Sequence, residues 1–147
     1  MTCSTSQIND IIVVAGDNLF ELSLMDVANF FKKKKSNVIV LYDVKDTELA
    51  KHYGIVEVNN NIIVNFEEKP LNPKSTLAST GIYLFPKKTI SLIKKYIDQG
   101  NNPDKTGSFI EWLHKRDVVY SYVSDKKWYD IGSIEQLERA NRYYKEK

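Results

Sequence analysis

The chain has 147 residues, of which 42% are hydrophobic and 27% are charged, and its formal net charge is +2. This length suits one globular domain with a substantial core. The near-neutral charge, with Arg116, Arg139 and Arg142 as the only arginines, argues against a nucleic-acid partner. The single cysteine, Cys3, excludes a disulfide scaffold and favours a reducing cytoplasm, and no apolar run is long enough to span a membrane.

The first third of the chain predicts a strand, a helix and a second strand. Ile11–Ala15 is continuously apolar, which is typical of a strand covered on both faces, and Gly16–Asn18 ends it. Ser23 followed by Asp26 predicts a capping box at the start of a helix. Val38–Tyr42 is a second apolar strand. A strand–helix–strand unit is the building block of a parallel sheet with a right-handed crossover.

The rest of the chain continues the alternation of strands and helices. Asn59–Asn61 lies between the apolar segments 55–58 and 62–66, and asparagine tolerates the left-handed backbone of a tight turn, so this part predicts a β-hairpin. The pattern therefore indicates an α/β protein of a single domain, residues 1–147, with a mostly parallel sheet and a hairpin insertion. The same signals predict a helical turn over 46–52, strands over 78–85 and 118–123, and helices over 87–99, 106–116 and 134–144.

Charged side chains follow three of the predicted strands at the point where each strand ends. Asp17 follows the first strand, Glu67–Lys69 follow the hairpin, and Asp130 precedes the final helix. Because ligands of open α/β sheets bind at the carboxyl ends of the strands, these residues predict one site for an anionic, phosphorylated ligand. Carboxylates in such a place can hold Mg²⁺, and a lysine can neutralise a phosphate.

Each of these segments, taken alone, also has a plain structural interpretation. Gly16–Asn18 can be a turn whose aspartate bonds to nearby backbone, and Glu67–Lys69 can be the polar exit of a hairpin. Trp128 can be core or a pocket wall, and Gly54, after Tyr53, can turn the chain or allow a ligand to approach closely. No two glycines of the sequence are close enough to form the phosphate-binding nest of a nucleotide site.

Taken together and in this order, five segments resemble the sugar-phosphate nucleotidyltransferase family. Its best-known members are glucose-1-phosphate thymidylyltransferases and glucose-1-phosphate uridylyltransferases. No single segment is decisive, but five in register are specific, and the resemblance spans residues 9–142. The matching segments are Ala15–Asn18, Tyr53–Val56, Phe66–Pro70, Ser79–Tyr83 and Trp128–Gly132.

The resemblance implies a doubly wound α/β fold and a reaction. A sugar 1-phosphate attacks the α-phosphorus of a nucleoside triphosphate (NTP), giving an NDP-sugar and pyrophosphate. Such a transfer needs positioning and charge neutralisation more than covalent chemistry. By the resemblance, Asp17 and Asp130 bind catalytic Mg²⁺ and Lys69 binds the sugar phosphate. The residues that it places in or near the sugar pocket are Glu68, Tyr53, Gly54, Thr80 and Trp128.

The family begins with a strand and a glycine-rich loop containing an arginine, which this sequence does not show. By the resemblance, residues 1–147 correspond to the C-terminal part of a nucleotidyltransferase domain, with the NTP-binding segment missing. In the family, Ile11–Ala15 pairs with strands of that segment, so we expect an exposed apolar sheet edge here. The chain is then expected to form a homo-oligomer, to pair with an N-terminal chain, or to be a piece of a longer protein.

Three functions of different classes stay open at this point. The first is a sugar-1-phosphate nucleotidyltransferase, or the sugar-phosphate and metal-binding part of one. The second is a non-catalytic sugar-phosphate-binding or regulatory protein that pairs with another chain, since Glu68 and Lys69 permit binding without catalysis. The third is a structural or nucleic-acid-binding protein that acts through Lys32–Lys35. Nucleic-acid binding is disfavoured because no aromatic residues are interleaved with that run.

Overall fold

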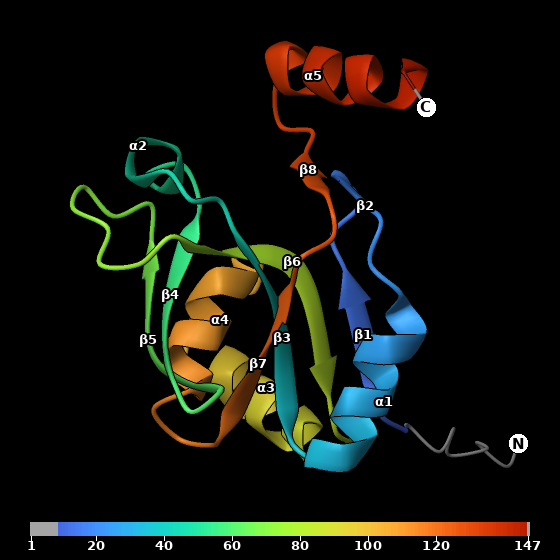
Figure 1. Ribbon diagram of the computed structural model, residues 1–147. Coiled ribbons are helices and arrows are strands. Elements are labelled where there is room, and N and C mark those ends of the chain that lie inside the picture. The colour runs from blue at the N-terminus through green and yellow to red at the C-terminus, as the bar shows by residue number, and fades with distance from the viewer. Residues whose placement is uncertain (1–8, 147) are drawn as a thin grey trace, which may run out of the picture.

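The computed structural model describes residues 9–146, which form eight strands and five helices (Figure 1). Cys3 lies outside the described residues. The strands are β1 (Ile11–Val14), β2 (Asn18–Phe20), β3 (Asn37–Asp43), β4 (Gly54–Asn59), β5 (Ile62–Glu68), β6 (Leu77–Phe85), β7 (Val119–Ser124) and β8 (Trp128–Asp130). The helices are α1 (Leu24–Lys34), α2 (Thr47–Ala50), α3 (Thr89–Asp98), α4 (Thr106–Leu113) and α5 (Ile134–Lys145).

Within residues 9–146, six strands form one mixed sheet in the order β1-β6-β3-β7-β5-β4, and a further pairing of β4 with β6 curls the sheet round on itself. The prediction of a mostly parallel sheet is wrong. In this part of the chain only β3 and β7 pair in parallel, and the other pairings of the sheet are antiparallel. The strand β6 lies between β1 and β3, so the strand–helix–strand unit does not bring those two together. The apolar run of β3 is buried, but such a run has the same appearance in a parallel strand and in an antiparallel strand that lies between helices.

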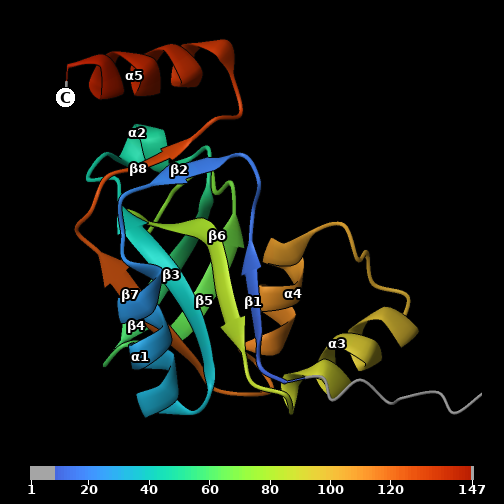
Figure 2. The same ribbon diagram turned by 90° about the vertical axis from the view of Figure 1, so that its right-hand side faces the viewer.

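Helices cover both faces of the sheet, which confirms the α/β class (Figure 2). On one face, α1 packs Val27 and Phe31 against β3 and β6. On the other, Tyr96 of α3 and Phe109 and Leu113 of α4 pack against β3, β5 and β6. No helix within residues 9–146 is long and apolar enough to cross a lipid bilayer.

The strand β1 lies at one edge of the sheet and, within the described residues, pairs with β6 alone. The prediction that both of its faces are covered is wrong, because Ile12 is 48% exposed and Val14 is 41% exposed. The cause is the position of α1, which packs over β3 and β6 rather than over β1. The predicted exposed apolar edge is therefore present in this structure.

Two local predictions are confirmed by hydrogen bonds and backbone angles. The Ser23 hydroxyl accepts a hydrogen bond from the backbone N–H of Asp26 at 3.2 Å, which confirms the N-cap of α1. The return bond from the Ser23 N–H to the Asp26 carboxylate, which would complete the predicted capping box, is not made within residues 9–146. Asn60 and Asn61 have φ angles of 50° and 61°, in the left-handed region, and close the β4–β5 hairpin. Both signals depend on residues that are neighbours in the sequence, which is why they can be recognised without the fold.

The end of β1 is held against a glycine of β6. The backbone N–H of Ala15 donates to the carbonyl oxygen of Gly81 at 2.9 Å, and Gly81 has a φ of 75°. A Cβ atom on Gly81 would lie 2.7 Å from the Cβ of Ala15, closer than two such atoms can approach. This contact fixes the end of β1 and therefore the position of Asp17, which follows it.

We predict that Gly81→Ala lowers the free energy of unfolding by about 2 to 5 kcal/mol in urea titrations. Left-handed strain accounts for about 1 to 2 kcal/mol, and crowding against Ala15 adds about 1 to 3 kcal/mol. Gly100→Ala is the matched control, because Gly100 has a φ of 80° but open space around its Cβ position. Equal losses in the two variants would show that the contact with Ala15 does not constrain the fold.

Candidate functional site

The two aspartates predicted to bind a cation are brought together by a small second sheet. The strands β2 and β8 pair antiparallel, with Asn18 opposite Asp130. The backbone N–H of Ile131 donates to the carbonyl oxygen of Asp17 at 2.7 Å, which continues the pairing by one step. These strands were not predicted from the sequence, because three residues each are too few to show a pattern.

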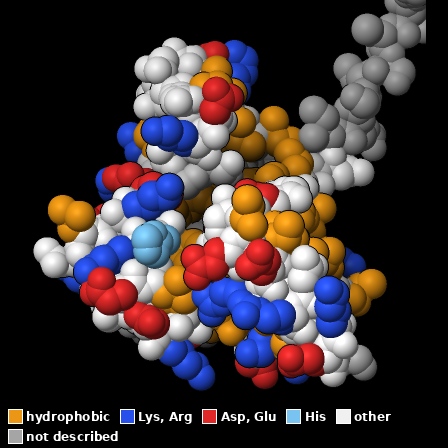
Figure 3. Space-filling view, turned by 90° about the horizontal axis from the view of Figure 1, so that it is seen from above, with side chains coloured by type: hydrophobic (Ala, Val, Ile, Leu, Met, Phe, Trp, Pro, Cys, Tyr) orange, Lys and Arg blue, Asp and Glu red, His pale blue; other side chains and the backbone are white. Residues whose placement is uncertain are grey.

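One cleft contains all the residues that the sequence predicted for the site, and its volume is about 430 Å³. Figure 3 looks down on this end of the molecule, where acidic and basic side chains gather around a hollow with hydrophobic side chains in its wall. The predicted residues that line the cleft are Asp17, Tyr53, Gly54, Glu68, Lys69, Thr80, Trp128 and Asp130.

Hydrogen bonds hold the residues at the end of the β4–β5 hairpin beside those at its start. Gly54 lies opposite Glu68 in the β4–β5 register, and the backbone N–H of Lys69 donates to the carbonyl oxygen of Tyr53 at 3.0 Å. Lys69 has a φ of 47°, a left-handed conformation that is unfavourable for lysine and common at functional sites. The carboxylate of Glu68 and the ammonium of Lys69 are both exposed at the cleft, where a ligand can reach them.

Two glycines leave room for the carboxylate of Glu68. A Cβ atom on Gly54 would lie 2.6 Å from Cζ of Phe66 and 3.0 Å from Oε2 of Glu68. A Cβ atom on Gly107, in the first turn of α4, would lie 2.9 Å from the same oxygen. Gly107 lines the cleft but was not predicted, because its sequence carries no signal that α4 begins beside the hairpin.

Thr80 and Trp128 form part of the wall without offering a free polar group. The Thr80 hydroxyl is buried and donates to the carbonyl oxygen of Val40 at 2.9 Å, so it supports the sheet. Trp128 is 8% exposed and packs edge-on against Tyr53, with 5.1 Å between the ring centroids. Both interpretations of Trp128 therefore hold, since it is core on one side and cleft wall on the other.

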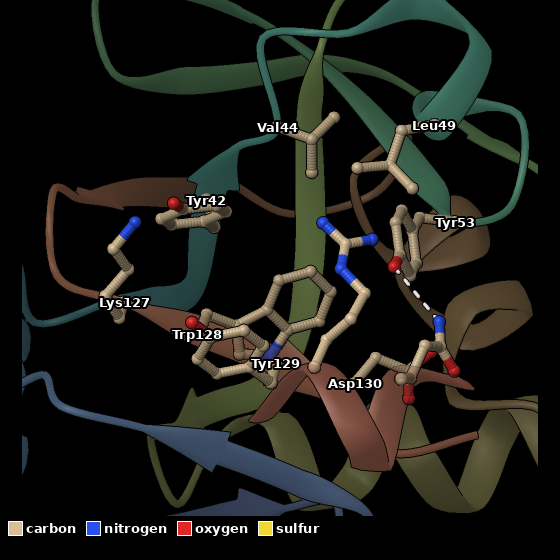
Figure 4. A pocket seen from close by; sticks show the side chains of 10 residues that line it. Tyr42, Val44, Leu49, Tyr53, Lys127, Trp128, Tyr129 and Asp130 are labelled. Carbon is tan, nitrogen blue, oxygen red and sulfur yellow. Dashed lines mark hydrogen bonds between the residues drawn. The ribbon is translucent and has the colours of Figure 1, made fainter. Parts of the chain in front are cut away.

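The wall formed by Tyr53, Trp128 and Asp130 also borders a second, smaller pocket of about 200 Å³ (Figure 4). In this view the hydroxyl of Tyr53 accepts a hydrogen bond from the side-chain amide of Gln136 in α5, at 3.4 Å. Gln136 also interacts with the carboxylate of Asp130, whose pKa it acts to lower. The helix α5 thus supports the cleft wall from outside.

Electrostatic interactions link three charged groups of the cleft. Burial, and then the neighbouring carboxylate of Asp17, raise the pKa of Asp130 above its ordinary value, while Lys69 and Gln136 oppose the rise. Two carboxylates near each other fit a divalent cation, which would relieve their repulsion. Among residues 9–146, no three His, Cys, Asp or Glu side chains gather into a metal site. A site with one or two protein carboxylates needs further ligands, which substrate phosphate and water can supply.

The comparison with protein families identifies the chain. The model of the family described as nucleotidyl transferase matches residues 2–147, so the chain belongs to that family. It is 31% identical over 139 residues to a glucose-1-phosphate adenylyltransferase of Clostridium acetobutylicum, covering 89% of this chain and 36% of the relative. It is 32% identical over 137 residues to the enzyme of the same name from Mycoplasma mobile, covering 88% of this chain and 35% of the relative.

Solved structures agree with the family. A candidate glucose-1-phosphate thymidylyltransferase from Bacillus anthracis, in complex with sucrose, matches with a TM-score of 0.77 and 30% identity, over 92% of this chain and 54% of that one. A UDP-glucose pyrophosphorylase in complex with UDP-glucose matches with a TM-score of 0.76 over 95% of this chain and 57% of that one, and at 22% identity it supports the fold alone. The chain spans about a third of the length of the curated relatives and about half of these solved chains.

We predict that Asp130→Asn raises the free energy of unfolding at neutral pH. Because the folded state raises the pKa of Asp130, it binds the proton more tightly than the unfolded state, so stability is lost as pH rises from the ordinary value of 3.8 through the raised value. The asparagine variant escapes this loss. Urea titrations over a range of pH should show the two proteins equally stable below pH 3.8 and diverging above it.

Asp125→Asn is the control for this prediction. The Asp125 carboxylate is 88% exposed and lies in the turn before β8, outside the cleft. It should show no pH-dependent gain in stability. If Asp130→Asn gains nothing either, the two aspartates of the cleft do not repel each other in solution.

Proposed function

We propose that this chain is the sugar-phosphate and metal-binding part of a sugar-1-phosphate nucleotidyltransferase. The observation that carries the proposal is one cleft in which two carboxylates, Asp17 and Asp130, accompany Glu68 and Lys69. The first two suit a cation, and the second two suit the hydroxyls and the phosphate of a sugar phosphate. Family membership supports the same reaction class.

In the proposed reaction an oxygen of the sugar phosphate attacks the α-phosphorus of an NTP. A new P–O bond forms, the bond to the bridging β-phosphate oxygen breaks, and pyrophosphate leaves. Lys69 neutralises and orients the sugar phosphate, and Glu68 accepts hydrogen bonds from the sugar hydroxyls. Mg²⁺ held by Asp17 and Asp130 would neutralise charge on the reacting phosphates. These residues contribute position and charge, which is what such a transfer requires.

We propose glucose 1-phosphate as the sugar substrate. The names of the relatives share glucose, while they differ in the nucleotide, which is adenylyl, thymidylyl or UDP. The second substrate is therefore an NTP whose base we leave open.

A non-catalytic protein that binds sugar phosphate or regulates another chain is the second candidate function, because the chain spans only part of each relative. Formation of NDP-sugar from glucose 1-phosphate, Mg²⁺ and each of the common NTPs by the chain separates the two.

We predict that Lys69→Gln weakens the binding of glucose 1-phosphate about 10-fold or more in isothermal titration calorimetry. The variant removes a charged hydrogen-bond donor, and such bonds contribute about 1.5 to 3 kcal/mol. Glu68→Gln should also weaken binding, because a neutral amide is a poorer acceptor for sugar hydroxyls.

Lys74→Gln serves as the matched control for the lysine variant. Lys74 is exposed in the loop that follows Lys69 but does not line the cleft. The Lys74→Gln variant removes the same charge at a position outside the cleft, so the affinity for glucose 1-phosphate should stay within about twofold. If Lys69→Gln and Lys74→Gln bind alike, the phosphate does not contact Lys69 and the assignment of the cleft is wrong.

We also propose that the free edge of β1 takes up a further strand, supplied by a second copy of this chain when no other chain offers one. Within the described residues this edge has no strand beside it, and Ile12 and Val14 expose apolar surface along it. An unpaired apolar edge is a template for association. A separate N-terminal chain of the family fold would occupy the same edge.

We predict that the chain associates as its concentration rises, and that Val14→Lys shifts it toward monomer in sedimentation equilibrium. A charge on the edge strand must be desolvated when a second strand pairs there. Val64→Lys is the control, because Val64 is 52% exposed on β5, away from β1. A chain that stays monomeric at every concentration would contradict pairing between copies.

A further inference from the structure

A chain of two hydrogen bonds runs from a buried indole to a cleft carboxylate. The indole Nε1–H of Trp128 donates to Oδ1 of Asn18 at 2.7 Å. The side-chain Nδ2–H of Asn18 then donates to Oδ1 of Asp17 at 2.8 Å. An indole N–H can only donate, so the amide oxygen of Asn18 must face Trp128 and its NH₂ group must face Asp17. The direction of both bonds is therefore set by the chemistry of the tryptophan.

Trp128 and Asp17, at the two ends of this hydrogen-bonded path, differ greatly in burial. Trp128 is 8% exposed and packs with Ala50, Ile55 and Ala78, whereas Asp17 is exposed. Asn18 connects them from a fixed position, because its backbone pairs with Asp130 across the β2–β8 sheet. The buried ring of Trp128 therefore fixes the orientation of the exposed Asp17 carboxylate through Asn18.

The bond from Asn18 also decides which oxygen of Asp17 is available. Oδ1 accepts the amide N–H, while Oδ2 accepts no hydrogen bond from any group among residues 9–146. Asp17 and Asp130 are near enough to interact electrostatically. Without Asn18, the exposed Asp17 side chain is free to rotate away from Asp130, because nothing else among the described residues bonds to its carboxylate.

The other end of the chain reaches the part of the cleft proposed to hold the sugar. Trp128 packs against Tyr53, with ring centroids 5.1 Å apart, and both rings line the cleft. A ligand packed against these rings would contact a residue that is linked to Asp17 through Asn18. The two hydrogen bonds therefore connect the aromatic wall of the cleft with one of its carboxylates.

We propose that Asn18 is a positioning residue that couples binding of sugar phosphate beside Trp128 to binding of a divalent cation at Asp17. The proposal rests on the function proposed above. Thermodynamic linkage requires the coupling to be reciprocal, so each ligand raises the affinity of the other by the same factor. Part of that factor comes from direct contact between phosphate and cation, and the remainder is transmitted through Asn18.

The test measures this factor in variants that break the path at different points. Mn²⁺ binding is followed by electron paramagnetic resonance with and without saturating glucose 1-phosphate. Trp128→Phe keeps an aromatic ring but removes the N–H donor, and Asn18→Ala removes both bonds at a partly exposed position. The control is Trp112→Phe, because Trp112 lies on α4, stacks with Arg116 and does not line the cleft.

We expect both path variants to bind Mn²⁺ about tenfold or more weakly in the absence of sugar phosphate, the size of one lost hydrogen bond to a charged group. The coupling factor should also fall by about threefold or more, whereas Trp112→Phe should match the unmodified chain in both measurements. In the Trp112→Phe background, the fluorescence of Trp128 should change when Mn²⁺ binds and should stop responding once Asn18 is replaced. A merely structural role for Asn18 would lower the melting temperature without removing this fluorescence response.

The outcomes separate the inference from the function on which it rests. If the unmodified chain binds both ligands and the path variants retain the coupling factor of Trp112→Phe, the inference is overturned and the proposed function stands. If the unmodified chain binds neither ligand, both are overturned. Should Trp128→Phe fail to fold, Asn18→Ala alone decides between these results, because it leaves the aromatic core intact.

Discussion

The candidate site depends on the antiparallel pairing of two three-residue strands, β2 and β8. The strands β2 and β8 join segments of the chain that lie 110 residues apart at Asn18 and Trp128, and this pairing brings Asp17 beside Asp130. Without it, one aspartate would follow an edge strand and the other would precede a helix, with no reason to meet. The same pairing presses the indole nitrogen of Trp128 against Asn18. The carboxylate pair and the aromatic wall are therefore one structural unit.

Several features of the cleft are unfavourable for folding. The carboxylates of Asp17 and Asp130 repel each other, and Lys69 adopts a left-handed backbone that few lysines adopt. Gly54 and Gly107 give up side-chain packing to leave room for one carboxylate. These features all line one cleft, whereas the two cores beneath it are apolar and closely packed. Such a distribution is expected where residues are retained for a ligand rather than for stability.

Features that depend on residues close together in the sequence could be predicted, and features that depend on distant residues could not. The cap at Ser23 and the turn at Asn60 depend on neighbours, and both are confirmed. The chemistry of Asp17, Lys69 and Asp130 pointed to one site, and they line one cleft, although their roles stay predictions. The direction of β6 could not be predicted, because an apolar strand has the same pattern in either direction. Gly107 was missed since its contact with Glu68 exists only after α4 has packed against the hairpin.

The open edge of β1 and the proposed cation site are adjacent for a geometric reason. Asp17 lies three residues beyond the end of β1, at the same end of the sheet as the cleft. A strand added in parallel to the free edge of β1 would end beside Asp17, and the loop after it would face the cleft. In the proposed reaction the NTP must meet the sugar phosphate across the cation, so such a loop is where its phosphates are best held. In the proposed reaction the exposed edge would then be more than an association hazard, because a strand covering it would bring the second substrate to the sugar-phosphate side of the cleft.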